Sequence, residues 1–381
     1  MGYRISLLSK HLICWAVTGL LMISLAQAQD LALEFIGQQI IPHNHQYKDT
    51  IVGGLSALEY DVRTGRYIAI CDDRSDTGPA RFYGLKLGYD ASGFHSWQLT
   101  DVHTMKRPDG SVFPAPSFMG ASSVDPEALK LSPAHSSYLW TSEGHAKKGV
   151  NPFVREMKLD GTYIRDFAVP EKYHIGEGTG IRDNLAFEAL TVTTDQKSIL
   201  LSIEGPLIQD GAEADAEQGA DVRLLQMDID SGQPVHEYVY TVEPVHKETL
   251  PFGNFSINGV VDILALDRDQ YIVVERSFST GAGLSVKLYL ADLSAATDVL
   301  GLHSLKGATY QTAQKTLLLD LGELGIPIDN IEGMTFGRTL KDGRRTLVLI
   351  SDNNFRSAQI SQILVFAVDG LAEKLTSKTP H

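Results

Sequence analysis

The sequence predicts an all-β protein that forms a single β-propeller, closed into a ring by its N-terminal strand. Three observations predict this fold. One type of segment recurs five times along the chain, each copy has the pattern of a β-hairpin, and the 3.6-residue periodicity of helices is scarce. A pair of β-sandwiches is the alternative fold that the same strands would allow.

The first 28 residues predict a secretory signal peptide. Arg4 and Lys10 supply positive charge, residues 12–25 are almost wholly apolar, and Ala26 to Ala28 form the small-x-small pattern that a signal peptidase needs. An apolar run of about 14 residues is shorter than the ~20 required to cross a bilayer, which disfavours a membrane anchor. We therefore expect an exported protein, periplasmic or extracellular, with no membrane attachment after cleavage.

The charge of the mature chain narrows the classes of partner. The full chain has 33 Lys and Arg against 47 Asp and Glu, and cleavage removes two basic residues and no acid, so the mature net charge is 31 − 47 = −16. This negative charge disfavours nucleic acids and anionic membranes as partners. It favours cations as partners, or it serves only to keep the protein soluble. Cleavage also removes Cys14, so Cys71 remains alone and no intramolecular disulfide can form. We expect a monomer that a large hydrophobic core stabilises.

The five repeated segments are the main support for a propeller. Each consists of a short strand, a turn of polar or small residues, and a second, continuously apolar strand that ends in an acid. The segments are residues 54–73, 125–144, 187–205, 261–277 and 331–354. Weaker strands follow each hairpin, so one unit has about four strands in 60–75 residues, which suits a propeller blade.

The number of blades and the closure of the ring follow from the remaining strands. Five blades are visible, and a sixth is compatible with the length. Residues 31–41 can supply the missing strand of the blade that begins near Ile331. No linker divides the chain, so we expect one propeller domain over residues 29–370 and a C-terminal tail over residues 371–381.

Acidic residues occupy two corresponding positions of the repeats. The first position holds Ser56, Glu127, Glu188, Asp262 and Glu332. The second position holds Asp72 or Asp73, then Glu143, Glu204, Glu275 and Asp352. The first acid begins one strand and the second ends its antiparallel neighbour, so both lie at the same end of the hairpin. Repeated around a ring, this arrangement predicts about nine carboxylates near one mouth of the central channel.

So many carboxylates repel one another unless something compensates their charge. A hard cation such as Ca²⁺, which takes six to eight oxygen ligands, is one candidate. Nearby basic side chains, among them Arg74, Arg276 and Arg356, are another, and backbone N–H groups of adjacent blades are a third, purely structural one. The predicted metal ligands are Asp73, Glu127, Glu143, Glu188, Glu204, Asp262, Glu275, Glu332 and Asp352.

Four motifs resemble the phytase-like family named for esterase-like activity. They are NLAFEAL (184–190), VVERSFSTG (273–281), NIEGMTFG (330–337) and LVLISDNNF (347–355), in the order of the family. The resemblance implies a propeller akin to calcium-dependent phytases and hydrolysis of phosphate or other esters. Carried over by motif, the best site candidates are Glu188, Glu275, Arg276, Glu332, Asp352 and Asn353. The chain departs from the family pattern at Ser56, Ala186, Ala189 and Ser277.

Two functions follow from these predictions. In the first, the chain is a Ca²⁺-dependent hydrolase of a small anionic ester or phosphate, in which Arg276 and Arg356 bind anionic oxygens and Glu188 or Glu332 acts as ligand or general base. In the second, a non-catalytic propeller binds a small ligand or an exported protein through the same acidic mouth. A serine esterase is disfavoured because the chain contains no G-x-S-x-G motif.

Overall fold

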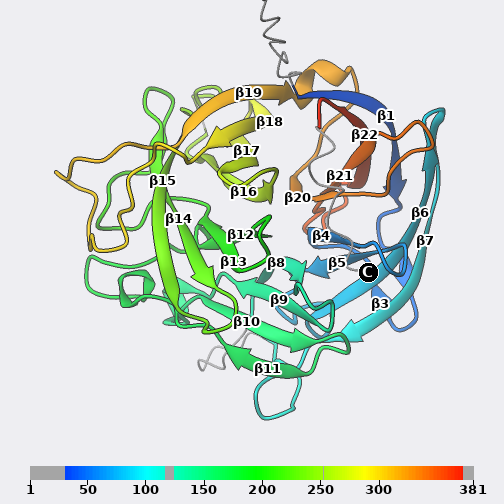
Figure 1. The fold of residues 1–381 in the computed structure, drawn as a ribbon, viewed down its shortest axis with the longest axis horizontal. Coiled ribbons are helices and arrows are strands. Elements are labelled where there is room, and N and C mark those ends of the chain that lie inside the picture. Colours follow the sequence, from blue (N-terminus) through cyan, green and yellow to red (C-terminus); the bar gives the residue numbers. More distant parts are fainter. Residues whose placement is uncertain (1–30, 116–123, 252, 372–381) are drawn as a thin grey trace, which may run out of the picture.

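A computed structural model describes residues 31–115, 124–251 and 253–371. These residues form five four-stranded antiparallel sheets arranged around a central axis, as Figure 1 shows. The prediction of a single propeller is therefore confirmed with five blades, and no sixth blade occurs in the described part of the chain. The predicted signal peptide lies outside the described residues, so its cleavage and the limits of the domain stay predictions.

The first four blades follow one another along the chain, each running from the channel outward. Blade 1 contains β4 (Leu55–Asp61), β5 (Arg66–Cys71), β6 (Arg81–Asp90) and β7 (Gly93–Thr104). Blade 2 contains β8 (Pro126–Leu131), β9 (Ser137–Ser142), β10 (Phe153–Lys158) and β11 (Tyr163–Asp166). Blade 3 contains β12 (Phe187–Val192), β13 (Ser198–Ile203), β14 (Ala220–Asp228) and β15 (Pro234–Val242). Blade 4 contains β16 (Ser256–Ala265), β17 (Gln270–Ser279), β18 (Gly283–Asp292) and β19 (Gln314–Asp320).

The fifth blade joins the two ends of the propeller. It contains β20 (Ile331–Phe336), β21 (Arg345–Ser351), β22 (Ser361–Asp369) and, as its outermost strand, β1 (Ala32–Ile41). The antiparallel pairing of β1 with β22 closes the ring, as predicted. The remaining elements are a hairpin of β2 (Gln46–Tyr47) and β3 (Thr50–Ile51) and three 3₁₀ helices, η1 (Ala146–Lys148), η2 (Glu171–Tyr173) and η3 (Leu321–Leu324).

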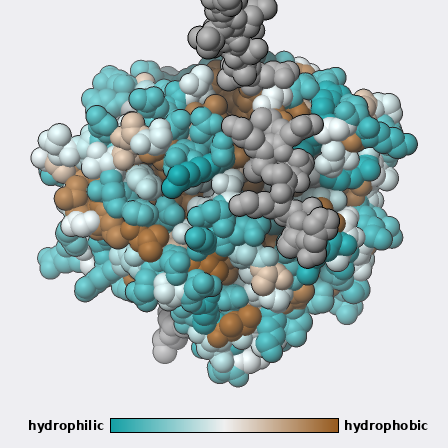
Figure 2. Space-filling model, viewed as in Figure 1, coloured by the Kyte–Doolittle hydropathy of each residue, from teal (hydrophilic) through white to brown (hydrophobic). Residues whose placement is uncertain are grey.

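The core lies between the faces of neighbouring blades. Strands β9 and β13 are buried at every position and β21 at every position but the first, which explains why the second strand of each repeat is continuously apolar instead of alternating. The innermost strands β4, β8, β12, β16 and β20 contact one another in a closed circle. The face of the propeller seen along its axis in Figure 2 is mostly hydrophilic, with small separate hydrophobic patches. None of the described helices is long and apolar enough to cross a membrane.

A lysine fastens the innermost strands to one another inside the channel. Lys130 of β8 is buried, and its Nζ donates to the carbonyl oxygens of Leu58 in β4, at 3.0 Å, and Met334 in β20, at 2.9 Å. These bonds connect blade 2 to blades 1 and 5 across the ring. Glu59 and Asp262 lie near the same ammonium group, so its charge is partly compensated.

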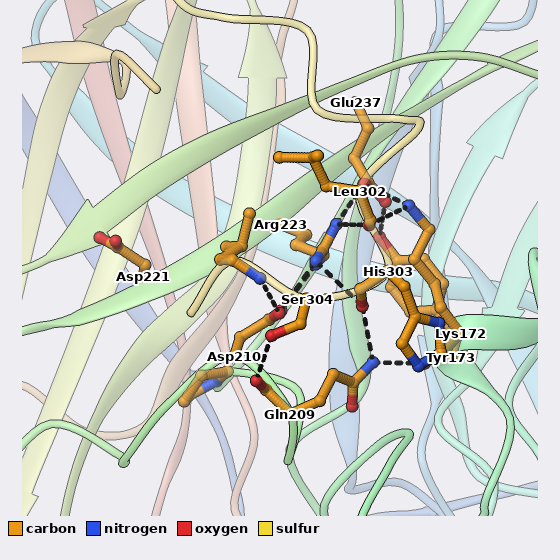
Figure 3. Close-up of polar contacts among 12 residues, drawn as sticks. Lys172, Tyr173, Gln209, Asp210, Asp221, Arg223, Glu237, Leu302, His303 and Ser304 are labelled. Carbon is orange, nitrogen blue, oxygen red and sulfur yellow. Dashed lines mark hydrogen bonds and ion pairs between the residues drawn. The ribbon is translucent and has the colours of Figure 1, made fainter. Parts of the chain in front are cut away.

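A second buried polar network holds the loop between β18 and β19 against blade 3 (Figure 3). Glu237 accepts hydrogen bonds from Lys172 Nζ at 2.8 Å, from the Tyr173 hydroxyl at 2.6 Å and from Arg223, and Arg223 also pairs with Asp210 at 2.6 Å. Both cations also donate to the carbonyl oxygen of Leu302 in that loop. Because these charged groups all have partners, the network is structural.

Each innermost strand contains a β-bulge next to the channel mouth. In blades 1, 3 and 5 the residues without a partner on the neighbouring strand are Ser56, Glu188 and Glu332. In blade 2 the irregularity spans Glu127 and the residue after it. A bulge re-aims the side chain of the extra residue and is common beside active sites. The bulges therefore fix the first acidic position of the repeats at the mouth.

Candidate functional site

The mouth of the channel opens into a cavity of about 1060 Å³ to which all five blades contribute. Asp72 comes from the end of blade 1, and Glu127, Glu188 and Glu332 come from the bulges of blades 2, 3 and 5. Arg276 comes from blade 4. Segments that are far apart in the sequence thus meet around one opening, as the spacing of the repeats predicts.

Eight carboxyl groups gather at this site, which we call the carboxylate centre. They are Asp72, Asp125, Glu127, Glu143, Glu188, Glu204, Glu332 and Asp352. In two groups the nearest carboxylate oxygens all lie within 4.8 Å of one another: one consists of Asp125, Glu127 and Glu143, the other of Glu143, Glu188 and Glu204. Glu143 belongs to both, so the two groups form a continuous acidic surface between blades 2 and 3.

Two arginines compensate part of this charge. Arg276 donates from Nη2 to Glu204 at 2.6 Å and from Nη1 to Glu332, and Nη1 also donates to Asn330 Oδ1 at 2.7 Å. Arg74 forms an ion pair with Asp125 at 2.5 Å and lies 3.9 Å from Glu143. Two guanidinium groups face eight carboxyl groups, so half of these carboxyl groups have no ion-pair partner among the described residues.

Burial and mutual repulsion shift the pKa values of the centre upward. Burial is the main cause of the raised pKa of Glu188, and the neighbouring Glu143 and Glu204 raise it further. Burial also raises the pKa of Glu332 to about 8 and that of Asp352 to about 6, although Arg276 opposes both shifts. A cation bound among these carboxyl groups would supply the missing positive charge and stabilise their ionised form.

Glu204 and Glu188 have carboxylate oxygens to which no group in the described part of the chain donates a hydrogen bond. Glu204 is fully buried, and its Oε2 has no hydrogen-bond partner in the described part of the chain. Glu188 lines the cavity, and among the described residues no side chain or backbone N–H donates to its carboxylate. A buried carboxylate oxygen without a donor is unfavourable unless a ligand occupies the space beside it. Both oxygens belong to the same group around Glu143.

Three of the predicted ligands do not reach the mouth. Asp262 accepts from the backbone N–H groups of Ile263, at 2.8 Å, and Met334, at 2.5 Å. Glu275 points outward and pairs with Lys315 at 2.6 Å. Asp73 forms a buried ion pair with Arg81 at 2.7 Å, and its neighbour Asp72 lines the cavity instead. The prediction that Asp73, Asp262 and Glu275 lie at the mouth is therefore wrong.

The register of blade 4 explains two of these errors. Val260 pairs with Glu275 and Asp262 pairs with Val274, so the bulged residue is Val261. In blade 3 the bulged residue is Glu188, and Phe187 before it pairs with Ile203. Val261 therefore corresponds to Glu188. Arg276, which follows Glu275, corresponds to Glu204, so blade 4 contributes a cation where the other blades contribute an acid.

Of the remaining predicted residues, some line the cavity and others lie behind its lining. Glu127, Glu188, Arg276, Glu332, Asp352 and Arg356 line the cavity, and Glu143 and Glu204 lie behind them in the two carboxylate groups. Asn353 has a structural position, because its Oδ1 accepts from the backbone N–H groups of Gly54 in blade 1 and of Phe355.

Asp125 and Asn330 belong to the site and were not predicted. Asp125 pairs with Arg74, and Asn330 donates to Glu332 at 2.8 Å. Each lies two residues before the bulge acid of its blade, in the patterns D-P-E and N-I-E. The recurrence of a polar residue at this position could have indicated them.

The comparison with known families agrees with this geometry. The family described as "Phytase-like: Esterase-like activity of phytase" matches residues 50–355, which is most of the chain. The chain belongs to this phytase-like family. In this phytase-like chain the match begins beside β3 and ends in the loop before β22, so it includes the innermost strands of all five blades and all eight acids of the carboxylate centre.

Solved structures similar to this phytase-like protein have low sequence identity. The catalytic domain of the Coprinopsis cinerea GH62 α-L-arabinofuranosidase is 10% identical, with a TM-score of 0.45, and the similarity covers 88% of this chain and 97% of that one. The periplasmic gluconolactonase of Pseudomonas aeruginosa is 10% identical, with a TM-score of 0.36 over 89% and 96% of the two chains. No curated protein matches the sequence.

Proposed function

We propose that this protein is an exported, metal-dependent hydrolase of small phosphate or other esters. The observation that carries the proposal is the carboxylate centre, in which eight buried or half-buried carboxyl groups surround one cavity with only two compensating arginines. Folded proteins bury such a surplus of like charge at great expense unless a cation occupies it. Membership of the phytase-like family supports ester hydrolysis as the reaction.

The residues of the centre fit a hard divalent cation. The donor set of Glu143, Glu188 and Glu204 consists only of carboxylate oxygens, which Ca²⁺ prefers, and the oxygen of Glu204 without a hydrogen-bond partner is a ready ligand atom. Asp125, Glu127 and Glu143 form a second candidate set. When bound there, the cation would supply Lewis-acid stabilisation of the negative charge that develops on an ester oxygen.

The chain's own side chains would position the ester. Arg356 lines the rim of the cavity, and its guanidinium has no side-chain partner among the described residues, so it is available to an anionic oxygen of the substrate. Arg276 is held by Glu204 and Glu332 and presents a fixed positive charge to the cavity. Glu188 or Glu332 would accept a proton, because both line the cavity and the pKa of each is raised above its ordinary value, which makes the carboxylate a stronger base.

The signal-like N-terminus supports export to the periplasm or the extracellular space, where Ca²⁺ is accessible. We also propose that the mature chain works as a monomer, without nucleic acid or membrane as a partner. The mature charge of −16 supports the absence of these anionic partners, since both would be repelled.

The test is hydrolysis of a chromogenic aryl phosphate and an aryl acetate by the purified mature chain, with CaCl₂ and with EDTA. We expect turnover that requires the metal and that falls by about 100-fold or more in Glu204→Gln and Glu188→Gln, which keep the shape of the side chain but remove its charge. Glu59→Gln is the matched control, because Glu59 is a carboxyl group of an innermost strand that lies beside Lys130 and does not line the cavity.

Turnover that survives EDTA and both substitutions would contradict the proposal. If CaCl₂ raises the melting temperature of the wild type but not of Glu204→Gln, and no ester is hydrolysed, the site binds metal without catalysis. That result would favour the non-catalytic propeller that binds a ligand or an exported protein through the same mouth.

A further inference from the structure

One wall of the cavity is apolar and has no part in the carboxylate centre. It consists of Phe255, Ile257, Phe278 and Leu284, all from blade 4, and we call it the apolar shelf. Phe255 is 55% exposed, and the other three side chains are half-buried. Large apolar side chains left open to solvent inside a cavity mark a surface that binds an apolar group.

The sheet of blade 4 arranges the shelf as one continuous row. Ile257 pairs with Phe278 across β16 and β17, and Phe278 pairs with Leu284 across β17 and β18, so the three side chains are cross-strand neighbours. The ring of Phe255 lies 6.0 Å from that of Phe278, between centroids. Four apolar side chains therefore form one surface.

The same strand connects the shelf to the carboxylate centre. Arg276 and Phe278 are two residues apart in β17, so they lie on the same face of the sheet, about 7 Å apart along the strand. A group held on the shelf would thus lie on the same face of the sheet as the guanidinium that pairs with Glu204 and Glu332. A small ester can bridge this distance.

The cavity offers few free basic side chains to bind the anionic groups of a substrate. The acidic side chains of the lining are Asp72, Glu127, Asp183, Glu188, Glu213, Asp329, Glu332 and Asp352. The basic ones are Arg74, Arg182, Arg276 and Arg356. Arg182 is already engaged by the carbonyl oxygens of Pro206, at 3.0 Å, and Gly211, at 2.6 Å. With Arg74 and Arg276 also paired, Arg356 alone remains for a substrate anion among the described residues.

We infer that the preferred substrate is an ester with one apolar aryl or acyl group and at most one anionic group, with the apolar group on the shelf and the ester at the carboxylate centre. This inference deepens the proposed function and rests on it for the reaction, but not for the binding preference. Phosphate esters and carboxylic esters can both carry such an apolar group, so the shelf can bind either type.

The experiment measures the binding of two phosphonates that the protein cannot hydrolyse, phenylphosphonate and methylphosphonate, by calorimetry in the presence of CaCl₂. We expect the phenyl compound to bind about tenfold tighter or more, since its ring is transferred from water to an apolar surface. In Phe255→Ala and Leu284→Ala the preference should fall to about threefold or less. Leu317→Ala is the matched control, because Leu317 is 50% exposed on the same blade but outside the cavity.

Equal binding of the two phosphonates, binding of neither, or tighter binding of an inositol polyphosphate would overturn the inference. So would a phenyl preference that both shelf variants retain. A phenyl preference that the shelf variants lose, in a protein that hydrolyses no ester, would support the inference and contradict the proposed function alone. Turnover of phenyl phosphate against phenyl acetate then shows which ester type the centre acts on.

Discussion

The replacement Arg276→Met tests the electrostatics of the site most directly. The guanidinium of Arg276 is 12% exposed and contacts Glu204, Glu332 and Asn330, and methionine keeps the apolar stem but removes the charge. Removal of one partner of a buried ion pair destabilises a protein by about 3–5 kcal/mol. The unfolding entropy of about 2.1 cal/mol/K per residue gives about 0.7 kcal/mol/K for a chain of ~340 ordered residues, so the melting temperature should fall by about 4–7 °C in EDTA.

Calcium should reverse most of this loss, because a bound cation would replace the missing positive charge beside Glu204. The assay is scanning calorimetry of both proteins in EDTA and in CaCl₂ near neutral pH. The control is Arg155→Met, which removes an ion pair with the half-exposed Asp166 and should lower the melting temperature by about 1 °C or less. If the two variants melt alike in EDTA, or if calcium stabilises the wild type as strongly as Arg276→Met, the electrostatic account of the site is wrong.

Two further predictions concern stability. In EDTA, the free energy of unfolding should decrease as the pH rises through about 6 and about 8, because burial raises the pKa of Asp352 and Glu332 to these values, so the folded state holds protons that the unfolded state has already released. Urea unfolding at a series of pH values checks this, and a flat profile would contradict it. Lys130→Met should lower the free energy of unfolding by about 2–4 kcal/mol, because it removes the charged hydrogen bonds to Leu58 and Met334. Urea midpoints equal to those of the exposed control Lys86→Met would refute this reasoning.

The sequence predicts the architecture because each blade repeats the same physical requirement. The second strand of a blade is covered on both faces, so its apolar run is continuous, and the turns around it carry polar and small residues. Residues 31–41 have no partner strand next to them in the sequence, and blade 5 lacks a fourth strand of its own. Together these facts predict the pairing of β1 with β22, which the structure confirms.

The site is less predictable because its residues depend on strand register. The spacing from the first to the second repeat position is 16 residues in blades 1, 2 and 3, whereas the acids of blade 4, Asp262 and Glu275, are only 13 apart. The structural equivalents of blade 4, Val261 and Arg276, are 15 apart, which is much closer to the other blades. Alignment by residue type therefore misplaced two carboxylates. A shift of one residue moves a side chain to the opposite face of a sheet, and no local pattern reveals the position of a bulge.

The different register of the acids in blade 4 also makes the two sides of the cavity chemically different. A ring in which every blade carried acids at both positions would present a nearly uniform acidic mouth, suited to cations alone. Blade 4 instead carries Val261 and Arg276, and two residues further along the same face of β17 the apolar shelf begins at Phe278. One side of the cavity can therefore hold a metal ion among carboxylates, while the other offers a fixed positive charge and an apolar surface. An ester substrate needs both sides, since its charged and apolar parts require different surroundings.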